Sequence, residues 1–357
     1  MNAAEDATHT LHNTYSLRGA KIRDPLAWSK YLNQAIDMWG DEAEVVYSMH
    51  HWPVWGNEAL NKHLGLQRDM YRYINDETLR LANHGYTMVE IAEQIKLPDA
   101  IDKHFSNRGY YGSLNHDVKA TYVLYPVWFI GNPATLHTLT PVDASKRYVE
   151  MMGGVDALLQ KAKAYYDKGG YRWVAEVVNH AVFAEPGNQA AKNLQADVLE
   201  QLGYQAESGP WRNFYLTGAQ ELRNGVAKLP TPNTASPDTV RAMSLDLFFD
   251  YLAMRLNGPK AAGKHIVVNM DFTDTGEKYS LEMVNGVLNH TPNRQAKGAD
   301  ANLQLSRDAL NNIVLQQTTM KDAISAGKIK VTGSETKVQE LMSYLDSFEF
   351  WFNIVTP

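Results

Sequence analysis

The chain has 357 residues, which is enough for two or three domains, each with its own core. Its formal net charge of -6 and the lack of a Lys/Arg run argue against a nucleic-acid partner. The absence of cysteine excludes disulfides, thiolate zinc sites and cysteine nucleophiles, and no apolar stretch is long enough to predict a membrane span.

The first stretch, "AEDATHTLHN", is rich in side chains that can bind metals. Glu5, His9 and His12 have i, i+4, i+7 spacing, which would place them on one face of a helix. A capped, hydrogen-bonded polar turn is the alternative for these residues. Asn13 and Arg18 follow in a loop, where an amide and a guanidinium can hold a tetrahedral oxyanion or form a surface salt bridge.

A helix is predicted over residues 24–40. Asp24 is a suitable N-cap, Pro25 suits the first helical position, and Gly40 ends the pattern. The helix is followed by "VVYSMHHWPVWGN", a short β-branched strand that runs into a loop. Adjacent strand residues point to opposite faces, so at most one of His50 and His51 easily enters a given site, and either can be a structural histidine.

From about residue 57 the pattern is helical, and residues 155–225 alternate helices with short turns. "HAVFAEPGNQAAKNLQADVLEQLG" carries the Ala, Pro and Asn positions of a tetratricopeptide-like hairpin. Within the helical region, "NRGYYGSLNHD" places Tyr110, Tyr111 and His116 in or beside one short loop. This loop can bring a phenol and an imidazole to the rim of a site, or it can be an interdomain turn.

Residues 228–238 hold three prolines among small polar residues and are the predicted linker. An α+β domain follows, with a helix over 238–258, alternating strands, and helices at 307–317 and 335–346. The first of these helices carries an apolar stripe at 3–4 spacing, formed by Leu245, Phe248, Phe249 and Leu252. The stripe would either line an apolar groove or be part of the core.

Taken together, these motifs and the segments "HHWPVWGN" and "LGYQAESGPWRNFYLTGAQELRNG" closely resemble the zinc-dependent alkyl sulfatases that hydrolyse detergents such as dodecyl sulfate. The resemblance implies a multidomain fold. Residues 1–82 would be the remnant of an α/β metallo-β-lactamase-fold domain and 83–227 an all-α, tetratricopeptide-like dimerisation domain. Residues 239–357, after the 228–238 linker, would be an α+β sterol-carrier-like domain.

The resemblance also implies site residues. Glu5 and His50 match zinc ligands of a two-zinc site, with His51 less favoured than its neighbour. The sulfate would be held by Asn13 and Arg18 with help from Tyr110 and Tyr111, and His116 would supply a proton to the leaving alcohol. The family's HxHxDH metal motif does not occur in this sequence, so the chain is expected to be a truncated C-terminal portion with little activity alone.

The expected function is hydrolysis of alkyl sulfate esters to alcohol and sulfate by a homodimer. No nucleic acid and no membrane span are expected. A full-length member of the family would be periplasmic or secreted, although the chain itself encodes no export signal. The alternatives are a non-catalytic dimerisation and lipid-binding module with a vestigial metal site, or a scaffold that binds a protein through its helical hairpins.

Overall fold

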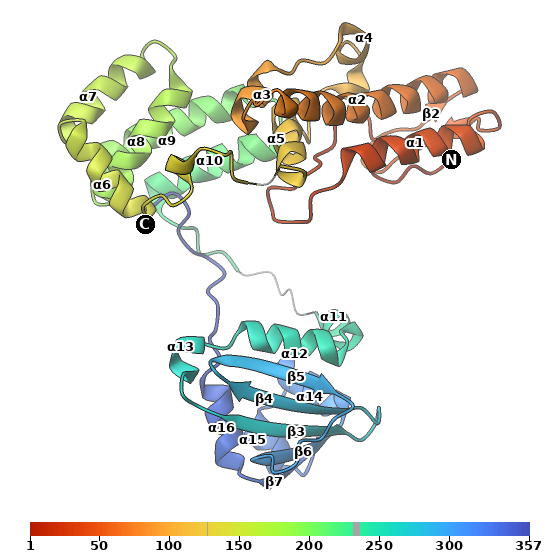
Figure 1. Cartoon of the computed structure of the whole chain (residues 1–357), viewed down its shortest axis with the longest axis vertical. Coiled ribbons are helices and arrows are strands. Elements are labelled where there is room, and N and C mark those ends of the chain that lie inside the picture. The colour runs from red at the N-terminus through yellow and green to blue at the C-terminus, as the bar shows by residue number, and fades with distance from the viewer. Residues whose placement is uncertain (127, 231–235) are drawn as a thin grey trace. The chain divides into compact units, whose positions relative to one another are not determined.

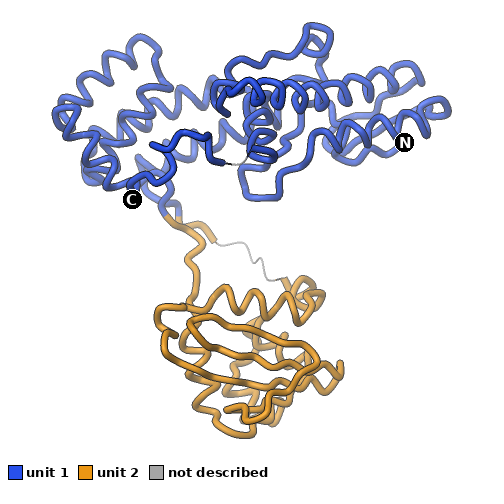
Figure 2. Tube along the Cα trace, in the orientation of Figure 1, with its two compact units in different colours: residues 1–227, 353–357 blue, residues 228–352 orange. Residues whose placement is uncertain are grey.

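The computed structural model describes residues 1–126, 128–230 and 236–357, which form two compact units. Unit 1 comprises residues 1–227 and 353–357, and unit 2 comprises residues 228–352, as Figure 2 shows. The predicted linker at 228–238 includes the boundary, although its residues 231–235 lie outside the described residues.

The N-terminal part of unit 1 is built on two long helices that pack side by side, α1 (Pro25–Trp39) and α2 (Asn57–Asn83) (Figure 1). The predicted caps of α1 are confirmed, since the Asp24 carboxylate accepts hydrogen bonds from the amides of residues 26 and 27 and Gly40 follows the last turn. In the sequence between the two helices, β1 (Val45–Val46) and β2 (Val54–Trp55) form a short antiparallel hairpin.

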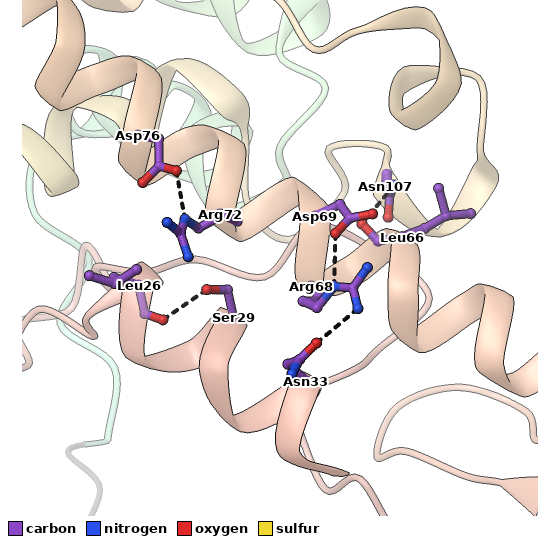
Figure 3. Close-up of polar contacts among 9 residues, drawn as sticks. All are labelled: Leu26, Ser29, Asn33, Leu66, Arg68, Asp69, Arg72, Asp76 and Asn107. Atoms are coloured by element: carbon purple, nitrogen blue, oxygen red, sulfur yellow. Dashed lines mark hydrogen bonds and ion pairs between the residues drawn. The ribbon is translucent and has the colours of Figure 1, made fainter. Parts of the chain in front are cut away.

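Polar contacts fasten α2 to α1 and to a following loop (Figure 3). The Arg68 guanidinium donates to Asn33 on α1 at 2.9 Å and to Asp69 at 2.8 Å. The Asn107 amide donates to the Leu66 carbonyl at 3.5 Å, which ties the following loop to the same helix. The position of that loop is therefore set by α2.

Shorter helices follow: α3 (Met88–Gln94), α4 (Asp99–Asp102), the 3-10 helix η1 (Phe105–Asn107) and α5 (Leu114–Leu124). The first apolar core of unit 1 runs from Ala7 to Tyr122 and includes residues of α1, α2, α3 and α5. The domain boundary predicted between residues 82 and 83 thus falls inside one continuous core, and it remains a prediction.

The rest of unit 1 is a series of packed helices after the 3-10 helix η2 (Pro133–Thr135). They are α6 (Pro141–Met151), α7 (Val155–Tyr166), α8 (Tyr171–Ala184), α9 (Gln189–Gln205) and α10 (Gly209–Asn224). Neighbours in sequence pack against one another, as expected for helical hairpins, and a second apolar core lies between them.

The last five residues belong to this helical part of unit 1. Two consecutive amides, of Ile354 and Val355, donate to one Glu221 carboxylate oxygen on α10 at 2.9 and 3.1 Å. The Val355 side chain packs against the second core. It lies close to Gly218, since a Cβ atom added to Gly218 would be 3.2 Å from the Val355 Cγ1 atom. The chain therefore leaves unit 1 at residue 227 and returns to it at residue 353.

Unit 2 is built on a five-stranded sheet of order β5-β4-β3-β6-β7. The strands are β3 (Ile266–Phe272), β4 (Lys278–Val284), β5 (Val287–Pro292), β6 (Ala301–Leu305) and β7 (Ile329–Gly333). All neighbours are antiparallel except β3 and β6, which are parallel, with Val268 opposite Leu281 on one side and Ala301 on the other. The predicted α+β character of this region is confirmed.

The helices of unit 2 are α11 (Pro237–Ala242), α12 (Leu245–Met254), α13 (Gly258–Ala261), α14 (Arg307–Val314), α15 (Met320–Ser325) and α16 (Glu335–Ser343). The single helix predicted over 238–258 is wrong. Ser244 interrupts it, because its hydroxyl accepts from the Leu247 amide at 3.2 Å and caps a new helix. Neither α15 nor β7 was predicted from the sequence.

The apolar stripe of α12 is part of the core of unit 2. Leu245, Phe248 and Phe249 are buried, and Leu252 packs against the same cluster. The core alternative is therefore what the structure shows. Across the described residues of both units, none of the helices has the length and apolar character required to cross a bilayer.

Candidate functional site

A cavity of about 1010 Å³ lies in unit 1. It is lined by residues from 5–23, 50–52 and 105–111, and by Glu207. The segments that line it are far apart in sequence. The lining includes charged side chains as well as two aromatic ones, Trp52 and Phe105, that are more than half exposed. A cavity of this size exceeds what a sulfate ion needs and has room for a larger organic anion.

The N-terminal segment that enters the cavity is a turn, not a helix. The one-face alternative for Glu5, His9 and His12 is therefore wrong, and the polar-turn alternative is what the structure shows. The segment is held in place because the Trp28 indole donates to the Asp6 carbonyl at 2.8 Å and Ser48 donates to the Ala7 carbonyl at 2.7 Å.

Glu5 and His50 meet at the cavity wall. The His50 Nε2 atom lies 2.9 Å from Glu5 Oε1, and this hydrogen bond is the main reason that the pKa of Glu5 is lowered. His50 has a φ of 73°, a left-handed conformation that is uncommon for a residue with a side chain and that often marks functional sites. The structure thus brings the two predicted ligand residues together.

His51 also lines the cavity, but it faces a different group of rings. The His9 ring lies 5.5 Å from that of His51, 5.1 Å from that of Trp52 and stacks on His63 at 4.8 Å. Burial, helped by the charges of His63 and His51, lowers the pKa of His9 to about 4. The His9 ring is therefore a neutral, packed aromatic group at physiological pH.

Three arginines line the cavity, and two of them, Arg18 and Arg23, belong to the N-terminal segment. Arg18 donates from Nη2 to the Tyr111 hydroxyl at 3.4 Å and from Nε to the Ser16 hydroxyl at 3.4 Å. Arg23, which was not predicted as a site residue, lines the same cavity and donates to the Asn13 carbonyl at 3.1 Å. Its position five residues after Arg18 in the same loop was the available signal.

Asn13 is buried beside the cavity but does not line it. Its side-chain amide donates to the Tyr111 carbonyl at 3.0 Å, so in this structure it fixes the main chain of the tyrosine pair. Tyr110 and Tyr111 both line the cavity. Arg18 and the two tyrosines therefore line the cavity, whereas the Asn13 side chain is buried next to it and bonds the main chain instead.

His12 lines the cavity and was not assigned a role from the sequence. Its Nδ1 atom lies 3.0 Å from the Asn13 carbonyl, which can only accept, so this nitrogen carries a proton and Nε2 is left for the cavity. The main-chain amide of His12 donates to the buried Tyr71 hydroxyl at 3.1 Å. Burial lowers the pKa of His12.

His116 does not line the cavity in this structure. The Trp211 indole donates to its Nδ1 at 3.3 Å, so the proton of the neutral ring is on Nε2, which bonds the Tyr15 carbonyl. Burial lowers the pKa of His116. Both ring nitrogens are therefore engaged, Nε2 with the 13–18 segment and Nδ1 with α10, and the structure does not bring His116 together with Glu5, His50 and Arg18.

The residue after His116 anchors the same segment. The Oδ1 atom of Asp117 accepts from the amide and the hydroxyl of Thr14, at 3.0 and 3.1 Å. Its Oδ2 atom is buried without a partner, and burial raises the pKa of Asp117 to about 8. The loop that carries Arg18 is thus fastened at its base by a carboxyl group that is mainly protonated at neutral pH.

The described residues do not make a complete zinc site. Zinc sites in proteins have three or four protein ligands, and in the described parts of the chain no cluster of three or more metal-ligating side chains is placed to hold an ion. Glu5 and His50 supply two donors. No catalytic step through zinc follows from this donor set.

Comparisons with known proteins agree on one family. The model for alkyl sulfatase dimerisation matches residues 87–225, and the model for the alkyl sulfatase C-terminal region matches residues 233–357. A linear primary-alkylsulfatase of a Pseudomonas species is 75% identical over the whole chain, which covers 53% of that protein. An (R)-specific secondary-alkylsulfatase of Pseudomonas is 42% identical, and the chain covers 54% of it.

The alkyl/aryl-sulfatase BDS1 of Saccharomyces cerevisiae is 43% identical over the whole chain, with 55% of its length covered. Among solved structures, the stereoselective inverting sec-alkylsulfatase Pisa1 from Pseudomonas matches all of this chain and 56% of its own, with a TM-score of 0.95 and 41% identity. The chain spans about half the length of these relatives. It carries the dimerisation and C-terminal domains of the alkyl sulfatases, and by these domains it belongs to that family.

Proposed function

We propose that the chain is the cavity-bearing part of an enzyme that hydrolyses alkyl sulfate esters to an alcohol and sulfate. The observation that carries the proposal is the cavity, which combines Arg18 and Arg23 with the Glu5–His50 pair in a chain 75% identical to a linear primary-alkylsulfatase. A sulfate monoester has an anionic head and an apolar tail, and the lining offers both cations and aromatic rings.

In this proposal Arg18 is the main ligand of the sulfate head. Its guanidinium presents several N–H donors in a planar fork that suits oxyanions, and the Tyr111 hydroxyl, 3.4 Å away, adds another donor. Arg23 adds a second positive charge. Fixed donors of this kind also stabilise charge that develops on sulfate oxygens during hydrolysis. Asn13 would act behind them, by holding the Tyr111 carbonyl.

The two zinc ions of the family site are part of the proposal. Glu5 and His50 would each contribute one ligand, and the remaining ligands would come from the half of the relatives that this chain does not span. A metallo-β-lactamase fold for the first domain rests on the same relationship. His116 as proton donor to the leaving alcohol would require its ring to leave the Tyr15 carbonyl and the Trp211 indole.

Homodimer formation and a sterol-carrier-like C-terminal domain complete the proposal. The family match at residues 87–225 supports the dimer. Exposed aromatic side chains on the helices of this region, including Tyr148, Trp173 and Phe214, would be covered by the second copy. Sedimentation of the full chain at micromolar concentration tests the dimer, and a stable monomer would contradict it.

The proposed function is tested by measuring the affinity of the full chain for octyl sulfate with isothermal titration calorimetry. Arg18→Ala should weaken binding at least tenfold, since a charge-assisted hydrogen bond to an anion contributes about 1.5–3 kcal/mol. Arg80→Ala is the matched control, because Arg80 pairs with Glu77 on α2 and does not line the cavity, and its affinity should be unchanged. Equal affinity of Arg18→Ala and the unmodified chain would contradict the proposal.

Turnover provides the second test. The chain alone should hydrolyse octyl sulfate poorly, whereas the chain supplied with the remaining half of a close relative, fused or in trans, should do so with zinc. In that complex Glu5→Ala and His50→Ala should each abolish turnover. Binding that persists without turnover in the reconstituted complex would favour the non-catalytic binding module instead.

A further inference from the structure

The cavity has a wall that does not belong to any helix or strand. Residues 108–112 contribute Arg108, Gly109, Tyr110 and Tyr111 to the lining, and they form bends with a single bridge from Gly109 to the N-terminal segment. A segment without regular structure has no hydrogen-bond ladder of its own. Its position must therefore come from the groups that bind its main chain and side chains.

Three consecutive residues at the N-terminal end of α10 bind this wall. The Gly209 amide donates to the Tyr110 carbonyl at 2.7 Å, and the Ser208 hydroxyl donates to the Tyr111 carbonyl at 3.0 Å. The Glu207 carboxylate pairs with the Arg108 guanidinium at 3.4 Å. Both these residues and the wall lie within residues 87–225, the range that matches the dimerisation model.

The opposite side of the wall is bound by the N-terminal segment. The Tyr111 carbonyl also accepts from the Asn13 amide at 3.0 Å, and the Gly112 amide donates to the Leu11 carbonyl at 2.9 Å. At Gly112 a Cβ atom would lie 2.5 Å from a Leu11 methyl carbon, so the two segments are in close contact. One carbonyl, that of Tyr111, is thus shared between donors from the N-terminal segment and from α10.

The fixed main chain at Tyr111 determines where the Tyr111 side chain lies in the cavity. Its hydroxyl lies 3.4 Å from Arg18, and its ring meets the His12 ring edge-on at 4.8 Å. Both neighbours line the cavity. A main chain fixed on two sides holds the phenol beside the guanidinium that would bind sulfate.

We infer that Ser208 is a positioning residue of the cavity, and that residues 207–209, at the start of α10, set the place of the tyrosine wall. The Ser208 side chain is buried, and its oxygen also accepts from the Trp211 amide at 3.5 Å as the N-cap of α10. Its hydroxyl proton is thereby left for the Tyr111 carbonyl. The link to substrate binding rests on the proposed function, whereas the link to the wall does not.

The test compares Ser208→Ala with Thr140→Ala in the full chain. Thr140 caps α6 in the same unit and does not line the cavity, so this control removes a cap without touching the wall. Hydrogen exchange of the amides in 108–112 should be at least tenfold faster in Ser208→Ala and unchanged in Thr140→Ala. Octyl sulfate should bind Ser208→Ala about five- to tenfold more weakly, with normal affinity for the control.

Two further variants separate positioning from loss of fold. Ser208→Thr keeps the hydroxyl and should restore slow exchange and affinity, and Glu207→Ala, at an exposed position, should also speed exchange in 108–112. Exchange in the wall that is as slow in Ser208→Ala as in Thr140→Ala would overturn the inference. If the unmodified chain does not bind octyl sulfate, the proposed function fails, and hydrogen exchange alone decides the role of Ser208.

Discussion

Asp117 offers a test of how the base of the Arg18 loop is held. The carboxyl group is fully buried, binds Thr14 through one oxygen, and has a second oxygen without a partner. Asp117→Asn keeps the accepting oxygen and removes the ionisable group. We expect this variant to be close to the unmodified chain in stability near pH 4, and more stable as the pH rises.

The sign follows from the raised pKa of Asp117, about 8 in the folded chain against 3.8 for an ordinary Asp. Between these values the unfolded chain has released the proton and the folded chain retains it. The free energy of unfolding therefore falls with rising pH by about 1.4 kcal/mol per pH unit for this group. Asp117→Asn removes that loss, so the stability of the variant relative to the unmodified chain should grow by about 3 kcal/mol between pH 5 and pH 7.

Urea unfolding at pH 5, 6 and 7, followed by tryptophan fluorescence, measures the difference. Seven of the eight Trp residues lie within residues 1–227, so the signal mainly reports unit 1. Buried histidines change the pH dependence of both proteins equally and cancel in the comparison. Asp99→Asn, at an exposed side chain on α4, is the control. A difference between Asp117→Asn and the unmodified chain that is constant with pH would refute the reasoning.

Three other outcomes are expected. Gly112→Ala should destabilise unit 1 by about 1–3 kcal/mol in urea unfolding, because its Cβ has no room, whereas Gly65→Ala, in open space within α2, should stabilise it by up to about 1 kcal/mol. Val355→Ala should lower the unfolding midpoint of unit 1 and leave that of unit 2 unchanged, since the side chain packs in the second core of unit 1. His50→Ala should raise the pKa of Glu5 toward its ordinary value in a carboxyl-carbon NMR titration, because the His50 hydrogen bond is the main cause of its lowering, and an unchanged titration would contradict the pairing.

The helices were predictable where the sequence carries local signals. Asp24, Pro25 and Gly40 mark the ends of α1 as expected, because caps act within one helical turn. Ser244 was the same kind of signal and was overlooked, so one predicted helix is two. β7 was missed since it is a short strand at the edge of the sheet, where pairing with β6 rather than a strong pattern decides its conformation.

The sequence predicted which residue types form the candidate site, but not which of their side chains face the cavity. Asn13 and Arg18 are both good oxyanion ligands, yet only Arg18 reaches the cavity, because the Asn13 amide is used by the Tyr111 carbonyl. His116 likewise has the chemistry of a proton donor, but its partners come from residues about 100 positions away in the chain. Contacts of that range depend on the packed fold, and a local sequence pattern does not encode them.

The return of the chain to unit 1 at residue 353 has a consequence for biosynthesis. Unit 2, residues 228–352, must be made before Val355 can reach the core and before Glu221 gains its two amide donors. At about 5–20 residues per second, this is a delay of about 6–25 s for the nascent chain. A ribosome-bound chain halted at residue 352 should therefore have an α10 more open to protease than the released protein, so the order of translation sets when the cavity-bearing unit matures.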